Sequence, residues 1–315
     1  MEFKHIPVLF NEVIDNLNIK PDGIYVDGTL GGAGHSSEIL KRLERGILIG
    51  IDKDEEALNI SKKRLENINN SKPEGLRTKL IFVNTDFKNL LKILDEENID
   101  KVDGILLDLG VSSYQIDNPE RGFSYMKSGK LDMRMDKKQK LDAKYILNNY
   151  SKEELENIFK NYGEEKAARK IASKIVKERE LKKIENTEEL VELIDDVKGF
   201  NKKGHNAKKV FQALRIEVNK ELDNLEDLVK ELIKRLNKNG RLLIITFHSL
   251  EDKIVKYAMQ EMEGKCICPP DFPVCVCGNI SYGKNIKGRK ILPQKEEMEN
   301  NPRSRSAILR GFIKK

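Results

Sequence analysis

The chain has 315 residues, of which 38% are hydrophobic and 35% are charged, so it can bury one large core or two smaller ones beneath a polar surface. It contains no apolar run near the roughly 20 residues that a membrane span needs. Its N-terminus also lacks the basic-then-apolar pattern of a signal peptide. These features exclude an integral membrane protein and predict a cytoplasmic protein with no membrane partner.

The net charge of +6 is unevenly spread along the chain. Residues 284–315 contain ten Lys or Arg and three Asp or Glu, whereas the remainder is close to neutral. A basic tail on a near-neutral body indicates a polyanionic partner such as RNA. A solvated tail explains the same charge equally well.

The first third of the chain alternates apolar strands with amphipathic helices. The strands are continuous apolar runs, which is typical of parallel strands covered by helices on both faces. The predicted strands are Gly23–Asp27, Ile47–Ile51, Leu80–Val83 and Ile105–Leu109.

The pattern then becomes helical and loop-like over 117–204, with no strand candidate in its helical part. The α/β pattern returns with a predicted helix at Val210–Leu236 and a strand at Arg241–Phe247. The sequence therefore predicts an α/β core formed by 1–116 and 205–315. An inserted, all-helical domain of a plausible size interrupts this core.

A glycine-rich turn follows the first strand, in the run Asp27–His35 (DGTLGGAGH). Glycines let the backbone turn sharply and approach a ligand closely, and Asp52 at the end of the second strand can hold a ribose. Together they predict a cofactor that contains a nucleoside. The dinucleotide spacing G-x-G-x-x-G is missing, and the run instead resembles the first motif of class I methyltransferases, which have a Rossmann-like core.

Further stretches resemble one family from end to end, the bacterial ribosomal RNA small-subunit methyltransferase H family, also called MraW. The matching runs are HIPVL at 5–9, DGTLGGAGHS at 27–36, DGILLDLGVSS at 103–113, ERGFSY at 120–125, LDMRMD at 131–136, YGEE at 162–165, FQALRIEVN at 211–219, FHSLED at 247–252 and NPRSRS at 301–306.

The resemblance implies an S-adenosylmethionine-dependent enzyme that methylates N4 of a cytidine in small-subunit (16S) ribosomal RNA, cytidine 1402 at the decoding site. It implies that the inserted helical domain recognises the substrate. Whether naked RNA or the assembled small subunit is the partner stays open, as does a homodimer. The cofactor-binding residues that the resemblance implies are Ala33, where many relatives have glycine, together with Gly34, His35, Asp52, Phe87, Asp108 and Gln115.

The implied reaction needs a group that polarises the exocyclic amine of cytosine, because the lone pair of this amine is delocalised into the ring. Asp108 ends the fourth strand, where amino-methyltransferases usually place this acceptor, and Ser112 and Ser113 follow in the next loop. We expect these three residues to be catalytic. Asp108 can equally serve the cofactor alone.

Four residues are candidates for contacts with the RNA substrate: Arg134, His248, Arg303 and Arg305. Arg134 can clamp a phosphate or belong to a buried ion pair at the domain boundary. His248 can contact RNA or be a hydrogen-bonded structural histidine. The two C-terminal arginines can meet phosphates, or they can close the sheet edge or cover the cofactor.

All four cysteines fall in one short segment, as two C-x-C pairs formed by Cys266 with Cys268 and Cys275 with Cys277. Four thiolates can bind one structural zinc ion. The spacing departs from the usual C-x-x-C, so reduced thiols and disulfides formed after isolation remain alternatives.

Two other classes of function remain. A nucleotide-cofactor oxidoreductase would use the glycine loop and Asp52, but it leaves the basic tail unexplained. A non-catalytic RNA-binding factor for ribosome assembly explains the tail and leaves the cofactor residues without a role.

Overall fold

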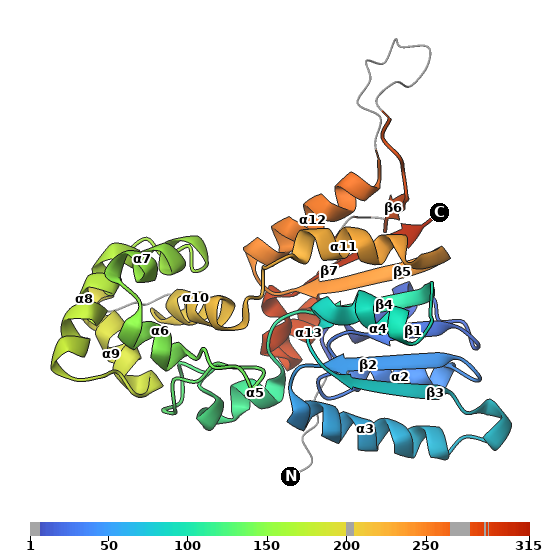
Figure 1. Cartoon of the computed structure of the whole chain (residues 1–315), viewed down its shortest axis with the longest axis horizontal. Coiled ribbons are helices and arrows are strands. Elements are labelled where there is room, and N and C mark those ends of the chain that lie inside the picture. Colours follow the sequence, from blue (N-terminus) through green and yellow to red (C-terminus); the bar gives the residue numbers. More distant parts are fainter. Residues whose placement is uncertain (1–6, 200–204, 265–277, 287, 289) are drawn as a thin grey trace. The chain divides into compact units, whose positions relative to one another are not determined.

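The computed structural model describes residues 7–199, 205–264, 278–286, 288 and 290–315. The chain forms two compact units (Figure 1). Unit 1 comprises Met1–Gly110 and Asn224–Lys315, and unit 2 comprises Val111–Asp223. No helix in the described part of the chain is long and apolar enough to cross a membrane.

Unit 1 is built on a seven-stranded sheet with the order β3-β2-β1-β4-β5-β7-β6. Strands β1 to β5 are parallel, and β7 runs antiparallel between β5 and β6. The strands are β1 Ile24–Asp27, β2 Ile47–Asp52, β3 Lys79–Asn84, β4 Val102–Asp108, β5 Leu236–Thr246, β6 Gly283–Asn285 and β7 Ile308–Lys314.

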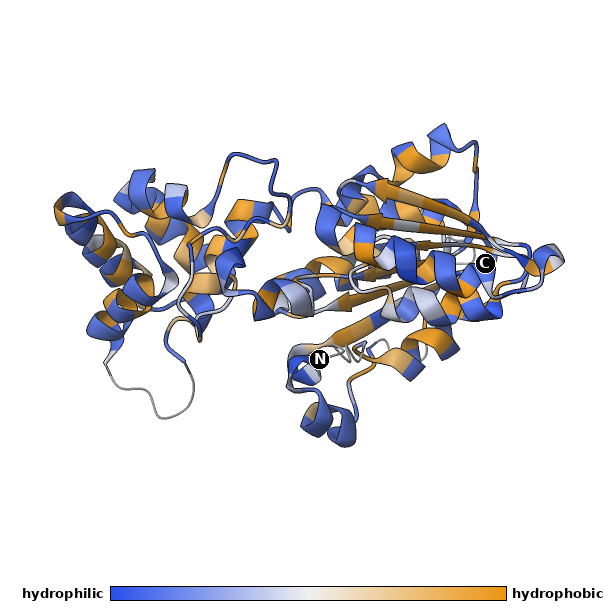
Figure 2. Ribbon diagram, turned by 90° about the horizontal axis from the view of Figure 1, so that it is seen from below, coloured by the Kyte–Doolittle hydropathy of each residue, from blue (hydrophilic) through white to orange (hydrophobic). Residues whose placement is uncertain are grey.

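Helices cover both faces of this sheet. Successive residues of a strand point to opposite faces, and the strands here have apolar residues on both. Val26 and Ile105 pack with α4, α11 and α12, whereas the adjacent Tyr25 and Leu106 pack with α1, α2 and α3. Figure 2 shows the resulting hydrophobic colour along the strands. The helices of unit 1 are α1 Phe10–Leu17, α2 Gly34–Arg42, α3 Glu55–Asn70, α4 Leu90–Glu96, α11 Leu225–Lys234, α12 Ser249–Met262 and α13 Lys295–Asn300.

The prediction of a Rossmann-like α/β core is confirmed, and all five predicted strands are present. The prediction of a basic tail is wrong for its last part. Residues Ile308–Lys314 are a strand of the sheet, in which Leu309 and Phe312 are fully buried. The strand is only seven residues long, and Arg310 and Gly311 at its centre interrupt the apolar run that would have indicated a buried strand.

Unit 2 is helical around a core of its own, as expected for the stretch after Leu141. Ser151 begins α7 with a capping box that includes Glu154, which satisfies two N–H groups at the start of the helix. The helices of unit 2 are α5 Ser113–Asp117, α6 Ala143–Asn149, α7 Lys152–Asn161, α8 Ala168–Leu181, α9 Thr187–Lys198 and α10 Lys208–Asn219.

The boundaries of the units differ from the predicted 116/117 and 204/205. The second boundary lies after Asp223 because the buried face of α10 belongs to the helical core of unit 2. The single helix expected over 210–236 is two helices, α10 and α11. Lys220 and Asn224, between them, have positive φ values of 51° and 57°, which break the helical path.

Candidate cofactor site at the carboxyl ends of the parallel strands

Three acidic residues end three adjacent strands of unit 1. Asp52, Asp27 and Asp108 are the last residues of β2, β1 and β4. The chain proceeds from β1 outward through β2 to β3 and then returns to β4 on the other side of β1. Ligands of open α/β sheets bind at such a switch in strand order, outside the carboxyl ends of the strands. The predicted cofactor residues of unit 1 therefore lie at the expected edge.

The glycines of the loop after β1 serve different purposes. A Cβ atom at Gly28 would lie 2.4 Å from Leu107 Cδ2, and one at Gly34 would lie 2.3 Å from Pro7 Cγ. These two glycines are required by close packing. A Cβ atom at Gly32 would meet no atom of the described residues within 4 Å. Gly32 therefore faces open space, and this is the part of the loop that a ligand can approach.

Two residues of the loop have left-handed backbone conformations. Gly31 has a φ of 49° and Ala33 a φ of 55°, directly before α2. A Cβ atom is disfavoured in this region. The backbone angle of Ala33 is thus one that glycine adopts more readily than alanine.

Asp52 is tied to the same loop. One carboxylate oxygen accepts the Gly31 N–H at 2.7 Å, and the other accepts the Asp54 N–H at 2.8 Å. Burial raises the pKa of Asp52 to about 6, against the opposing effect of these hydrogen bonds. The group is still mostly ionised at neutral pH. Because each carboxylate oxygen has two acceptor positions, one on each oxygen remains for a ribose hydroxyl.

Asp27 and Asp108 differ in their hydrogen bonds. Asp27 accepts from Ser36 Oγ at 2.6 Å and from the Thr29 N–H at 3.2 Å, and burial raises its pKa to about 6. Oδ1 of Asp108 is buried and has no hydrogen-bond partner among the described residues. Burial, followed by the charges of Asp27 and Glu251, raises the pKa of Asp108 to about 8. Of these three acids, only Asp108 has a buried oxygen without a donor among the described residues.

The remaining predicted cofactor residues of unit 1 surround the loop. The His35 ring is buried, stacks on Phe10 with ring centroids 6.0 Å apart, and has Nε2 3.1 Å from the Val8 carbonyl oxygen. Gly34 and His35 begin α2, whose first N–H groups can meet an anionic group of a ligand. Phe87 Cβ lies 3.2 Å from the position of a Cβ atom at Gly28, and the side chain is partly buried against the hydrophobic core of unit 1.

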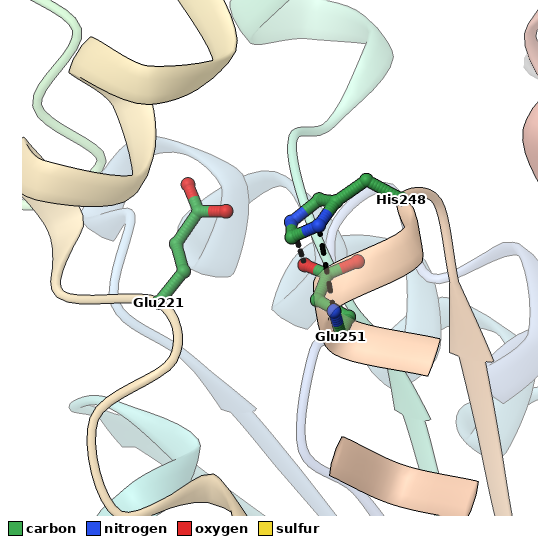
Figure 3. Close-up of side chains that lie close together, drawn as sticks. All are labelled: Glu221, His248 and Glu251. Carbon is green, nitrogen blue, oxygen red and sulfur yellow. Dashed lines mark hydrogen bonds and ion pairs between the residues drawn. The ribbon is translucent and has the colours of Figure 1, made fainter. Parts of the chain in front are cut away.

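His248 contacts Glu251 through both of its ring nitrogens at the start of α12. Its Nδ1 accepts the Glu251 N–H at 3.4 Å, and its Nε2 lies 3.1 Å from Glu251 Oε1 (Figure 3). The other oxygen of Glu251 accepts the Phe247 N–H at 3.0 Å. This arrangement favours the structural interpretation of His248. Glu221, also drawn in Figure 3, belongs to unit 2, where its carboxylate forms two hydrogen bonds with Arg215.

Several predicted site residues belong to unit 2. Ser112 and Gln115 form the capping box of α5, and Ser113 is the first residue of that helix. Arg134 uses four of its N–H donors within unit 2, two of them on Asp132 at 2.8 Å. This geometry favours the ion-pair interpretation of Arg134. The catalytic and cofactor roles of the other three stay predictions.

The C-terminal arginines separate into two kinds. Arg303 and Arg305 are exposed, as RNA contacts require, and Arg305 Nε donates to the Met298 carbonyl oxygen at 3.3 Å. Arg310 is buried in β7, where it forms a bidentate ion pair with Asp252 at 2.6 and 2.7 Å. Arg310 is thus a structural residue. The predicted zinc ligands Cys266, Cys268, Cys275 and Cys277 lie outside the described residues.

Sequence analysis missed three side chains that hold the loop. Thr29 Oγ1 accepts the Asp108 N–H at 2.6 Å and so joins β1 to β4. Ser61 and Arg64 of α3 donate to carbonyl oxygens of Gly31 and Gly32. The sequence contained a signal for one of these contacts, because Ser61 is a serine at a core-facing position of a predicted helix.

The comparisons with known proteins show the family to which the chain belongs. The sequence pattern of the MraW methylase family matches residues 2–315. Relatives named ribosomal RNA small subunit methyltransferase H are similar over the whole chain. One from Clostridium botulinum strain 657 is 56% identical over 98% of both chains. One from Finegoldia magna is 54% identical over 98% of both, and one from Lachnospira eligens is 52% identical over 99% of this chain and 98% of its own. The chain therefore belongs to the MraW methylase family and is an S-adenosylmethionine-dependent methyltransferase.

Proposed function

We propose that the protein methylates N4 of a cytidine in small-subunit ribosomal RNA, cytidine 1402 at the decoding site. Family membership and the names of relatives at 52–56% identity support the RNA substrate. The observation that carries the chemistry is Oδ1 of Asp108, a buried acceptor without a donor among the described residues, at the switch point of the sheet. An amine donor from a substrate would satisfy it.

The residues of unit 1 fit S-adenosylmethionine, which supplies an activated methyl group and a sulfonium leaving group. Asp52 would accept from both ribose hydroxyls, and Phe87 would pack on the adenine. The N–H groups that begin α2 would meet the carboxylate of the methionine part. The open space beside Gly32 leaves room for this ligand.

The role of Asp108 follows from its protonation. A nearby cationic ligand favours the ionised carboxylate, against the burial that raises the pKa of Asp108 to about 8. The ionised group can accept a hydrogen bond from the N4 amine and so make its lone pair more available. As the nitrogen–carbon bond forms and the carbon–sulfur bond breaks, Asp108 can take the proton that leaves the nitrogen.

The test is nucleoside mass spectrometry of small-subunit ribosomal RNA from cells with and without this protein. We expect N4-methylcytidine at cytidine 1402 to disappear in its absence. Purified protein with labelled S-adenosylmethionine should restore it on naked RNA or on assembled subunits, and the comparison identifies the preferred substrate. Label on a ring carbon or on a ribose hydroxyl would contradict the proposed chemistry.

A further inference from the structure

Two side chains of helix α3 form hydrogen bonds with the glycine loop, and neither belongs to a predicted cofactor residue. Ser61 Oγ donates to the Gly31 carbonyl oxygen at 2.5 Å, and Arg64 Nη1 donates to the Gly32 carbonyl oxygen at 3.0 Å. Residues three apart lie on the same side of a helix. One side of α3 therefore holds two successive peptide groups of the loop.

Ser61 has an unusual position for a serine. It is fully buried on α3, in a stripe that is otherwise formed by the apolar Ala57, Leu58 and Leu65. A serine within a helix often bonds the carbonyl four residues earlier, but this hydroxyl donates to the loop instead. Because a buried hydroxyl is costly without a partner, the contact with Gly31 accounts for the residue.

The Gly31 residue is fixed at both of its polar groups. Its N–H donates to Asp52 at 2.7 Å, and its carbonyl oxygen accepts from Ser61. Asp52 is also bonded to the start of α3, because its other oxygen accepts the N–H of Asp54, the N-cap residue. Loop, acid and helix thus form one closed set of hydrogen bonds, and a displacement of the loop would also displace the Asp52 carboxylate.

We infer that Ser61 and Arg64 are positioning residues for S-adenosylmethionine, which hold the Gly31 and Gly32 peptides in the geometry that binds it. The loop then has little freedom left to lose when the cofactor binds, and this raises affinity. The inference rests on the proposed role of Asp52 as the acceptor for the ribose.

The test is calorimetry of the full-length protein with S-adenosylmethionine and with S-adenosylhomocysteine. We expect Ser61→Ala to weaken both by about tenfold and the exposed Arg64→Ala to weaken both by about threefold, because each removes a hydrogen bond to the loop. The KM for S-adenosylmethionine should rise while kcat changes less than about twofold, because no reacting atom is touched. The control is Ser71→Ala, which removes an exposed hydroxyl bonded to the Ile68 carbonyl in the same helix.

A merely structural role would lower the unfolding temperature of Ser61→Ala and leave both affinities unchanged, and that result would overturn the inference. If Ser61→Ala does not fold, the cofactor affinities of Arg64→Ala test the inference alone, because the removal of an exposed side chain leaves no cavity. The affinities do not depend on the RNA target. A wild-type protein that binds S-adenosylmethionine but methylates no cytidine would therefore contradict the proposed function alone.

Discussion

The acidic residues at the candidate cofactor edge of unit 1 differ from the ion-paired acids Asp132 and Glu165 of unit 2. In unit 2, burial would raise the pKa of Asp132 and Glu165, but hydrogen bonds from Arg134 and Lys198 outweigh it and hold both pKa values below the usual range. At the cofactor edge of unit 1, Asp27, Asp52 and Asp108 form no ion pair within the described residues, and burial raises all three pKa values.

Under the proposed function, the difference separates acids that stabilise the fold through ion pairs from acids at the edge where the cofactor would bind. A buried charge without a partner is costly, so it persists where a bound group offsets the cost. The sulfonium of S-adenosylmethionine supplies a positive charge of the kind that this edge lacks. Asp132 and Glu165 of unit 2 already form ion pairs with Arg134 and Lys198.

The largest expected effect is that of Asp108→Asn. The substitution keeps size and burial but removes the ionisable group, so we expect the rate of methylation to fall by about 100-fold or more. Single-turnover measurements with labelled S-adenosylmethionine and small-subunit RNA check this. The thermal stability of the ligand-free variant should be at least that of the wild type, because the substitution removes a buried acid. A rate close to that of the wild type would show that Asp108 has no part in the chemistry.

The pH dependence of cofactor binding tests the same contrast. Because the folded pKa of Asp108 is raised from 3.8 to about 8, the folded state binds more protons, and the ligand-free protein should lose stability as pH rises between these values. A cationic ligand prefers the ionised form, so its affinity should rise with pH, by up to about tenfold per unit below pH ~8. Calorimetry across this range should show that Asp108→Asn flattens the dependence.

A third prediction compares one acid from each unit. Asp52→Ala removes the acceptor for two ribose hydroxyls, each worth about 1.5–3 kcal/mol, so affinity for S-adenosylmethionine should fall at least about tenfold. Glu165→Gln instead breaks the ion pair with Lys198, 2.7 Å in length, and should cost about 1–2 kcal/mol of stability. Its cofactor affinity should not change. Equal losses of affinity in both variants would remove the distinction between the two kinds of acid.

Much of this arrangement could be predicted from the sequence. Continuous apolar runs indicate parallel strands, and Asp52 could be placed because a strand end fixes the position of its last residue. The capping box at Ser151 could also be predicted, because its other member, Glu154, is three residues away. Each of these features depends on residues that are close together in the chain, so the pattern contains the information.

The features that were missed depend on residues distant in the chain. Strand β7 is stabilised by pairing with β5, about 70 residues earlier, and no local pattern encodes that pairing. The ion pair between Arg310 and Asp252 and the hydrogen bond between Ser61 and Gly31 are of the same kind. The division between α10 and α11 is a local feature instead: it depends on left-handed conformations at Asn224, a residue type that adopts them often, and at Lys220, a residue type that rarely does.

The smallest expected effect concerns the arginines of the C-terminal segment. Arg310 is buried against Asp252, whereas Arg303 and Arg305 are exposed on the 3₁₀ helix Pro302–Ser306 and can meet phosphates. Replacing both exposed arginines with glutamine should flatten the logarithmic salt dependence of RNA binding. The slope should change by about 0.7–0.9 for each phosphate that the protein no longer neutralises.

The matched control replaces Lys41 and Lys92, exposed lysines of α2 and α4, with glutamine and so removes the same charge elsewhere. If the arginines bind RNA, the control should change the slope less, because counterion release depends on phosphates directly neutralised and not on net charge alone. If instead the arginine variant keeps its salt slope and loses stability or cofactor affinity, both residues serve the fold as Arg310 does. Burial and exposure would then no longer separate structural from functional arginines in this segment.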